Sequence, residues 1–162
     1  MPADIVERQV TGGRSKEISL PMPTNDATLL VQLAVSTAVR LLEAQDGLLY
    51  PIAHAIDASE RSVFIGVYDG GVMPDPNRAL ENVRAALRNK PYRSTAVIYG
   101  IVLPDDSGRN ALCIEFESLD APAETIVVPF IITRPRLRAA RVITYASLRM
   151  PGANRVLTDG SA

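Results

Sequence analysis

His54 is the only histidine in this chain, and so the only imidazole available for acid or base chemistry. An imidazole titrates near neutral pH, so His54 could act as a general base assisted by Asp57 or Asp69. In the segment Leu48–Ile56, however, His54 alternates in phase with apolar side chains, and no nucleophile motif accompanies it. The sequence therefore favours a partly buried histidine that is hydrogen-bonded to the backbone.

A second group of titratable side chains lies in the segment Ala111–Ser118, where apolar residues alternate strictly with Cys113, Glu115 and Glu117. This alternation predicts a half-buried strand that carries these three side chains on its polar face. Two carboxylates at this spacing could share acid and base roles in a cleft, but a solvated sheet face explains them equally well and is preferred. Because the carboxylates raise the pKa of the neighbouring thiol, we expect Cys113 to be a poor nucleophile.

The most prominent charge cluster is a run of arginines that could bind phosphate or an acidic protein surface. The alternative is a solvated loop between strands. No aromatic residue is interleaved with these arginines, which disfavours binding of single-stranded nucleic acid by stacking. The candidate partner-binding residues are Arg134, Arg136, Arg138 and Arg141.

The sequence lacks the motifs that typically bind nucleotide cofactors or metals. The glycines near residue 70 form neither a P-loop nor a dinucleotide-binding motif. One histidine and one cysteine leave only carboxylates to complete a metal shell, so we expect no metal and no cofactor.

Composition indicates a soluble globular protein. Apolar residues make up 47% of the 162-residue chain and charged residues 22%, and 17 basic against 18 acidic side chains give a net charge of −1. This balance argues against long-range attraction to nucleic acid or to an anionic membrane. A single cysteine and the lack of a signal-peptide pattern lead us to expect a cytoplasmic protein without a disulfide.

The chain divides into an extended arm at residues 1–24, a single domain at 25–149 and a tail at 150–162. The domain should begin with a helix from Asn25 or Asp26 to Gln45, which Gly47 ends, followed by the hairpin 48–68. A second helix is predicted for residues 76–89, where Asp75 is the cap. Four strand-like stretches follow, namely Thr95–Leu103, Ala111–Ser118, Thr125–Thr133 and Arg141–Leu148.

This order, α-β-β-α-β-β-β-β, predicts an α+β fold with a largely antiparallel sheet of about six strands and both helices packed on one face. The order resembles that of sensor and scaffold domains of the GAF, PAS and profilin-like kinds. The segment Gly47–Asp57, together with Ile114–Glu117 and Val127–Phe130, also resembles a group of small uncharacterised bacterial proteins over Leu30–Thr133. That resemblance implies a bacterial origin and an accessory or immunity-like role, and it carries over no catalytic residue.

The sequence thus leads us to expect a non-enzymatic interaction module that binds another protein or a second copy of itself. Two alternatives stay open. One is a sensor with a small-molecule pocket between sheet and helices. The other is an enzyme that assembles its site from scattered polar groups, namely His54, Asp57, Asp69, Glu115 and Glu117. Convergence of those groups would favour the enzyme, whereas an exposed apolar patch would favour interaction.

Overall fold

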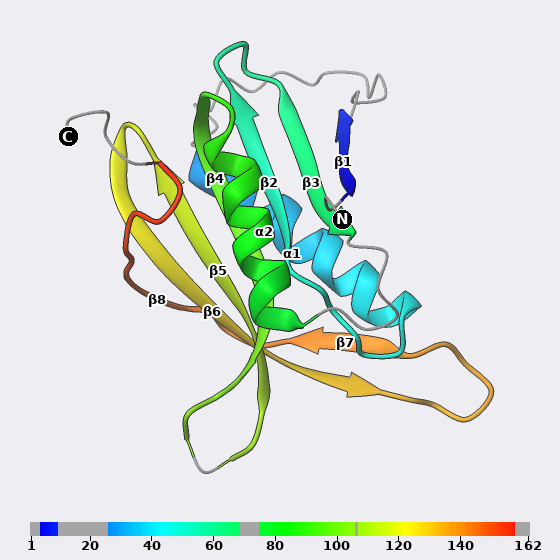
Figure 1. The fold of residues 1–162 in the computed structure, drawn as a ribbon. Coiled ribbons are helices and arrows are strands. Elements are labelled where there is room, and N and C mark those ends of the chain that lie inside the picture. The colour runs from blue at the N-terminus through cyan, green and yellow to red at the C-terminus, as the bar shows by residue number, and fades with distance from the viewer. Residues whose placement is uncertain (1–3, 10–25, 69–74, 106, 158–162) are drawn as a thin grey trace, which may run out of the picture.

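The structure is a computed structural model that describes residues 4–9, 26–68, 75–105 and 107–157 (Figure 1). Within these residues, two helices and eight strands follow one another. Their bounds are β1 Asp4–Gln9, α1 Asp26–Ala44, β2 Ile52–Asp57, β3 Ser62–Tyr68, α2 Pro76–Arg88, β4 Tyr92–Val102, β5 Asn110–Ser118, β6 Ala121–Thr133, β7 Arg141–Thr144 and β8 Leu148–Pro151.

All eight strands form one antiparallel sheet in the order β1-β3-β2-β4-β5-β6-β7, and β8 also pairs with β6. The outer edge of β6 is shared, because β7 pairs with Phe130–Thr133 and β8 pairs with Glu124–Val127. The predicted last strand is therefore two short strands separated by Tyr145–Ser147. Part of the predicted arm forms β1 beside β3, and the rest of that arm lies outside the described residues. The α+β class and the element order are confirmed.

The two helices cover opposite faces of the sheet, which corrects the expectation that both pack on one face (Figure 1). Under α1, the core contains Ile52 and Ile56 of β2, whereas Ala53 and Ala55 belong to the core under α2. Side chains of successive strand residues point to opposite faces, so β2 lies in the middle layer of a three-layer structure.

The helix ends follow the predicted local chemistry. The side chain of Asp75 accepts a hydrogen bond from the backbone N–H of Asn77 at 3.1 Å, and Pro76 opens α2. At the other helix, Gly47 has a φ of +88°, a left-handed conformation that glycine adopts without steric cost. Both predicted boundary signals are confirmed.

Helix α1 is long and apolar enough to cross a membrane by length and composition alone. In the fold it is amphipathic. Its buried residues lie four apart and pack on the sheet, namely Leu30, Ala34, Ala38 and Leu42. The exposed positions are mostly polar and share the same spacing, namely Thr28, Gln32, Ser36 and Arg40. The apolar stripe of α1 is therefore accounted for by the core.

Candidate functional site

Glu115 lies at the centre of a buried polar network between β5 and α2. Arg84 donates two hydrogen bonds to its carboxylate, from Nη2 to Oε1 at 2.6 Å and from Nε to Oε2 at 3.2 Å. The hydroxyl of Tyr99 donates to Oε1 at 2.8 Å, and Arg84 also binds Glu81. A bidentate arginine satisfies a buried carboxylate well. The network therefore holds α2 on the sheet, and the prediction of a solvated face is wrong because α2 covers it.

Glu117 is the more deeply buried of the two carboxylates, with 1% of its surface exposed. It accepts backbone N–H groups from Arg155 at 2.7 Å, from Val156 at 3.0 Å and from Leu157 at 2.7 Å. We call residues 152–157 the strap. Through the strap, part of the predicted tail packs on the domain, and the strap hides the carboxylate that was expected to face water.

Cys113 and Tyr99 lie beside Glu115 in the same layer. Burial raises the pKa of the Cys113 thiol, and the Glu115 carboxylate adds to the effect. Burial also raises the pKa of Tyr99, so its hydroxyl stays protonated and acts as a donor to Glu115. The expected weak nucleophilicity of Cys113 agrees with this shift, although burial rather than the carboxylates is its main cause.

His54 is buried on the other face of the sheet, under α1. Its Nε2 lies 3.0 Å from the hydroxyl Oγ1 of Thr37, and its ring meets that of Phe64 edge-on. The expected burial is found, but the hydrogen-bond partner is a side chain rather than the backbone. Burial lowers the pKa of His54 to about 4, and the nearby Arg40 contributes. The ring is therefore neutral at pH 7.

The polar groups proposed for an enzyme do not converge. His54 lies on the α1 side of the sheet, and Glu115 and Glu117 lie on the α2 side. Asp57 sits in the β2–β3 turn, where it accepts hydrogen bonds from the backbone and side chain of Arg61. Asp69 lies outside the described residues. The four described groups thus occupy three separate environments.

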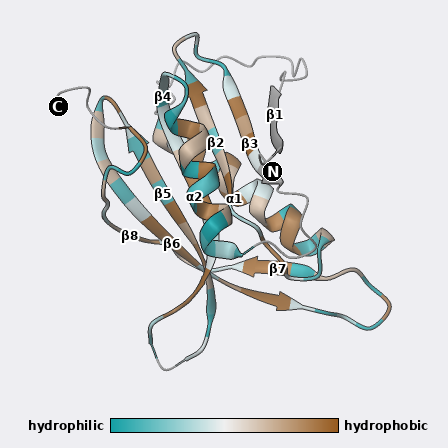
Figure 2. Cartoon of the chain, viewed as in Figure 1, coloured by the Kyte–Doolittle hydropathy of each residue, from teal (hydrophilic) through white to brown (hydrophobic). Residues whose placement is uncertain are grey.

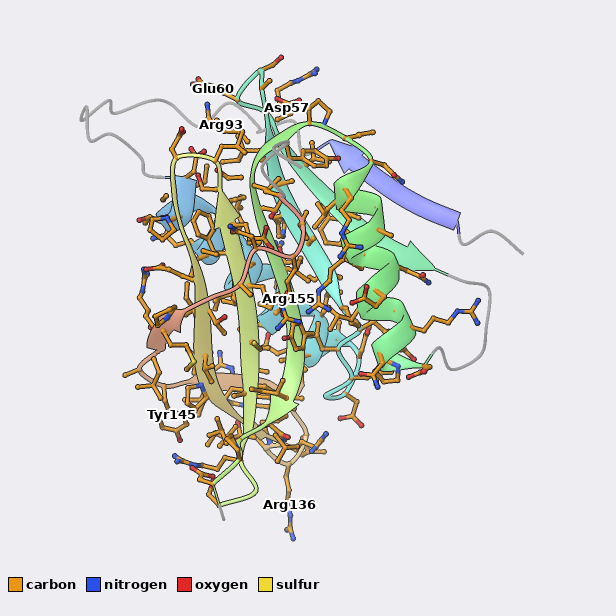
Figure 3. The ribbon with its side chains drawn as sticks, turned by 60° about the vertical axis from the view of Figure 1, so that its left-hand side comes forward. Asp57, Glu60, Arg93, Arg136, Tyr145 and Arg155 are labelled. Carbon is orange, nitrogen blue, oxygen red and sulfur yellow. The ribbon has the colours of Figure 1, made fainter. Side chains whose placement is uncertain are left out.

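Two adjoining grooves lie at the end of the sheet that carries the β2–β3 turn (Figure 3). Their volumes are about 530 and 340 Å³, and Lys90, Pro91 and Tyr92 line both. Arg93, which lines the larger groove, is already engaged by Asp26 and Glu60. The larger groove lies between the end of α2, the start of β4 and the strap, and both grooves are open to solvent. The sensor hypothesis expects a pocket that sheet and helices enclose.

The arginine run forms the exposed connection between β6 and β7. Arg134 pairs with Asp46, with 2.8 Å between Nε and Oδ1, so this residue fixes the base of the loop. Arg136 projects from the far end of the molecule in Figure 3. Arg138 and Arg141 are also exposed. All four arginines are therefore exposed, and Arg134 alone among them makes a described ion pair.

An apolar surface adjoins this loop on the side of the sheet that α2 covers elsewhere. The α1 side of β6 carries Ile126, Val128 and Phe130, so Ile131 and the residues in phase with it face the other side. Cross-strand pairing places Ile143 beside Ile131. Leu148 pairs with Val127 and Met150 with Thr125, which are also in phase with Ile131. Figure 2 colours much of β7 and the adjacent part of β6 as hydrophobic.

We call this surface the apolar-arginine face. Its large apolar side chains are between 39% and 61% exposed. Sequence reasoning missed them because a period-two strand pattern does not say whether a second layer covers a face. Its members are Ile131, Ile143, Tyr145, Leu148, Met150, Arg136, Arg138 and Arg141.

Fold and surface together define an α+β protein whose antiparallel sheet is covered by one helix on each face and is left open at one end of the α2 side. No protein-family model, no curated protein and no solved structure matches the chain. The surface itself is consequently the basis for assigning a function.

Proposed function

We propose that this chain is a non-enzymatic protein-interaction module that binds its partner through the apolar-arginine face. One observation carries the proposal, namely five large apolar side chains that share one surface and are each at least 39% exposed. Scattered single apolar residues are normal on a protein surface, whereas a contiguous group bordered by arginine is typical of an interface. Tyrosine and arginine are also the residue types that dominate binding energy at interfaces.

The charge of this region indicates the chemistry of the partner. Residues 131–151 contain five arginines and no acidic residue. The rest of the chain then holds 12 basic and 18 acidic side chains, from totals of 17 and 18. Two copies that met through this same face would bring like charges together, which is unfavourable. We therefore propose a partner that presents apolar residues within an acidic border, and an accessory or immunity-like role fits such a partner.

We further propose that the module acts as a soluble cytoplasmic protein. The support is the packing of α1, because its apolar stripe lies against the sheet while Thr28, Gln32 and Arg40 point outward. A helix whose apolar stripe packs on a sheet in this way does not need a bilayer to bury that stripe.

The test is capture of a partner from the native lysate by immobilised protein. Wild type is compared with the double variant Tyr145→Glu and Leu148→Glu, which places two charges on the apolar-arginine face. The matched control is Thr28→Glu with Gln32→Glu, which adds the same charge on the exposed side of α1. We expect wild type and control to retain the same stoichiometric partner and the face variant to lose it. Equal retention by all three proteins would exclude this face as the binding surface.

A further inference from the structure

The strap crosses the α2 side of the sheet from β8 to α2 and is hydrogen-bonded along the way. At its start, the N–H of Gly152 donates to the carbonyl of Ala123 at 2.9 Å. Further along, Arg88 of α2 donates from Nε to the carbonyl of Arg155 at 2.9 Å. Figure 3 shows Arg155 over the middle of the molecule, close to α2. The strap thus lies in a groove whose walls are α2 and the strands β5 and β6.

Glu117 is the main receptor group of this groove. Its described hydrogen bonds all come from the strap, from three successive backbone N–H groups at 2.7 to 3.1 Å. Successive N–H groups in a bend form a concavity that suits an anion, and here the buried carboxylate fills it. A carboxylate buried without such donors would be strongly unfavourable. The site is therefore built to hold a bent main-chain segment.

Recognition by this groove combines the main chain of the strap with a few of its side chains. Val156 is buried in the core, where it is 4% exposed among Leu87, Val83 and their neighbours, and the partly buried Leu157 packs against the same cluster. The side chains of Ala153, Asn154 and Arg155 are exposed. The Nε atom of Arg155 lies 3.8 Å from Oε1 of Glu115, and the described hydrogen bonds of the strap are to its main chain. A peptide therefore needs three free N–H groups and apolar residues in the places of Val156 and Leu157, and a basic residue in the place of Arg155 adds an ion pair.

The strap also has the features of a separable element. It belongs to no strand or helix, and it begins at Gly152, directly after Pro151. Gly152 is required there because a Cβ atom would lie 2.8 Å from the backbone carbon of Glu124. The strap is therefore attached at one constrained point and held elsewhere by the groove.

We propose that this groove is a peptide-recognition site for a bent segment with an apolar residue in the place of Val156, and that the strap of a second copy occupies it by exchange. An exchanged strap makes the same contacts as the closed one, so exchange is governed by concentration rather than by new interactions. The site uses residues separate from those of the apolar-arginine face. Failure of either proposal would therefore leave the other unaffected.

The test uses the full chain with Val156→Asp, which prevents the chain from seating its own strap, and a fluorescent peptide of residues 152–157. In wild type the tethered strap competes at an effective concentration on the order of 1 mM. We therefore expect the peptide to bind the Val156→Asp chain at least about tenfold more tightly than wild type. Adding Glu117→Gln to that chain should weaken the peptide at least about tenfold, since an amide nitrogen cannot accept an N–H.

Light scattering at increasing protein concentration tests directly whether two copies associate by exchanging their straps. Wild type should show a dimer fraction that grows with concentration, and Val156→Asp should stay monomeric. If Val156→Asp does not fold, Leu157→Pro removes one N–H donor with a smaller loss of packing and takes its place in both measurements. Equal peptide affinity for wild type and variant, no effect of Glu117→Gln, or a wild-type chain that is monomeric throughout would overturn the proposal.

Discussion

The buried histidine makes the stability of this protein sensitive to pH. In the unfolded chain His54 takes its ordinary pKa of 6.5, and in the fold burial and the nearby Arg40 lower the pKa to about 4. The folded state therefore binds fewer protons than the unfolded state between these two values, and stability falls as the pH decreases through that window. Integration from pH 7 to pH 5 gives a loss of about 2 kcal/mol in the free energy of unfolding.

Urea denaturation at a series of pH values measures this loss, and His54→Gln isolates its source. The variant loses some packing against Phe64 at every pH, but its stability should vary by much less than that of wild type between pH 7 and pH 5. Asp26, Asp57 and Asp105 do not interfere there, because their pKa values are lowered below 3.8. As the only histidine, His54 also gives a single imidazole signal whose titration can be followed by NMR. A titration midpoint at or above 6.5, or parallel stability curves for the two proteins, would refute this reasoning.

Three further outcomes follow from named contacts. Arg84→Met should lower the free energy of unfolding by about 3 to 5 kcal/mol because it removes the bidentate cation of buried Glu115 and leaves only Arg155, whose Nε lies 3.8 Å from Oε1, and adding Glu115→Leu should restore most of that loss; urea denaturation that shows additive losses would contradict this. Asp75→Ala should cost about 1 kcal/mol through loss of the α2 cap, and an unchanged unfolding midpoint would show that the cap is not used. Arg136→Glu combined with Arg138→Glu should weaken partner capture while leaving the melting temperature nearly unchanged, since both side chains are exposed; undiminished capture would remove the loop from the proposed interface.

The fold could be predicted as far as local patterns determine it. The α1 stripe, the Asp75 cap and the Gly47 stop are signals that lie within a few residues of one another, and the structure contains all three. The predicted layering, with both helices on one face of the sheet, was wrong because layering depends on which elements meet in space. The run Ile52–Ile56 is buried at every position, on both faces of β2. Such an unbroken run is typical of a strand covered on both sides, and here it was the available sign of a third layer.

At the candidate site, the surroundings of the charged residues of β5 also could not be predicted from local patterns alone. Alternation correctly separates the two faces of this strand, but it cannot say what lies over the charged one. Glu115 is covered by Arg84, which is 31 residues away in the sequence, and Glu117 by a segment 38 to 40 residues away. Those pairings appear only once α2 and the strap are placed. A strand face that carries carboxylates is therefore not necessarily a wet one.

The open part of the sheet differs from the part that α2 and the strap cover. Beneath α2 and the strap, even carboxylates are sealed from water, whereas at the outer end of the same side Ile143, Tyr145 and Leu148 stay exposed. Exposed apolar residues beside short edge strands invite uncontrolled pairing, and charges placed around them oppose it. Under the function proposed above, the arginines of the β6–β7 loop would fulfil that role in the free protein and would pair with an acidic border on the partner. We expect a face that excludes copies of itself by charge, and yet keeps its apolar centre open, to select a partner of opposite charge.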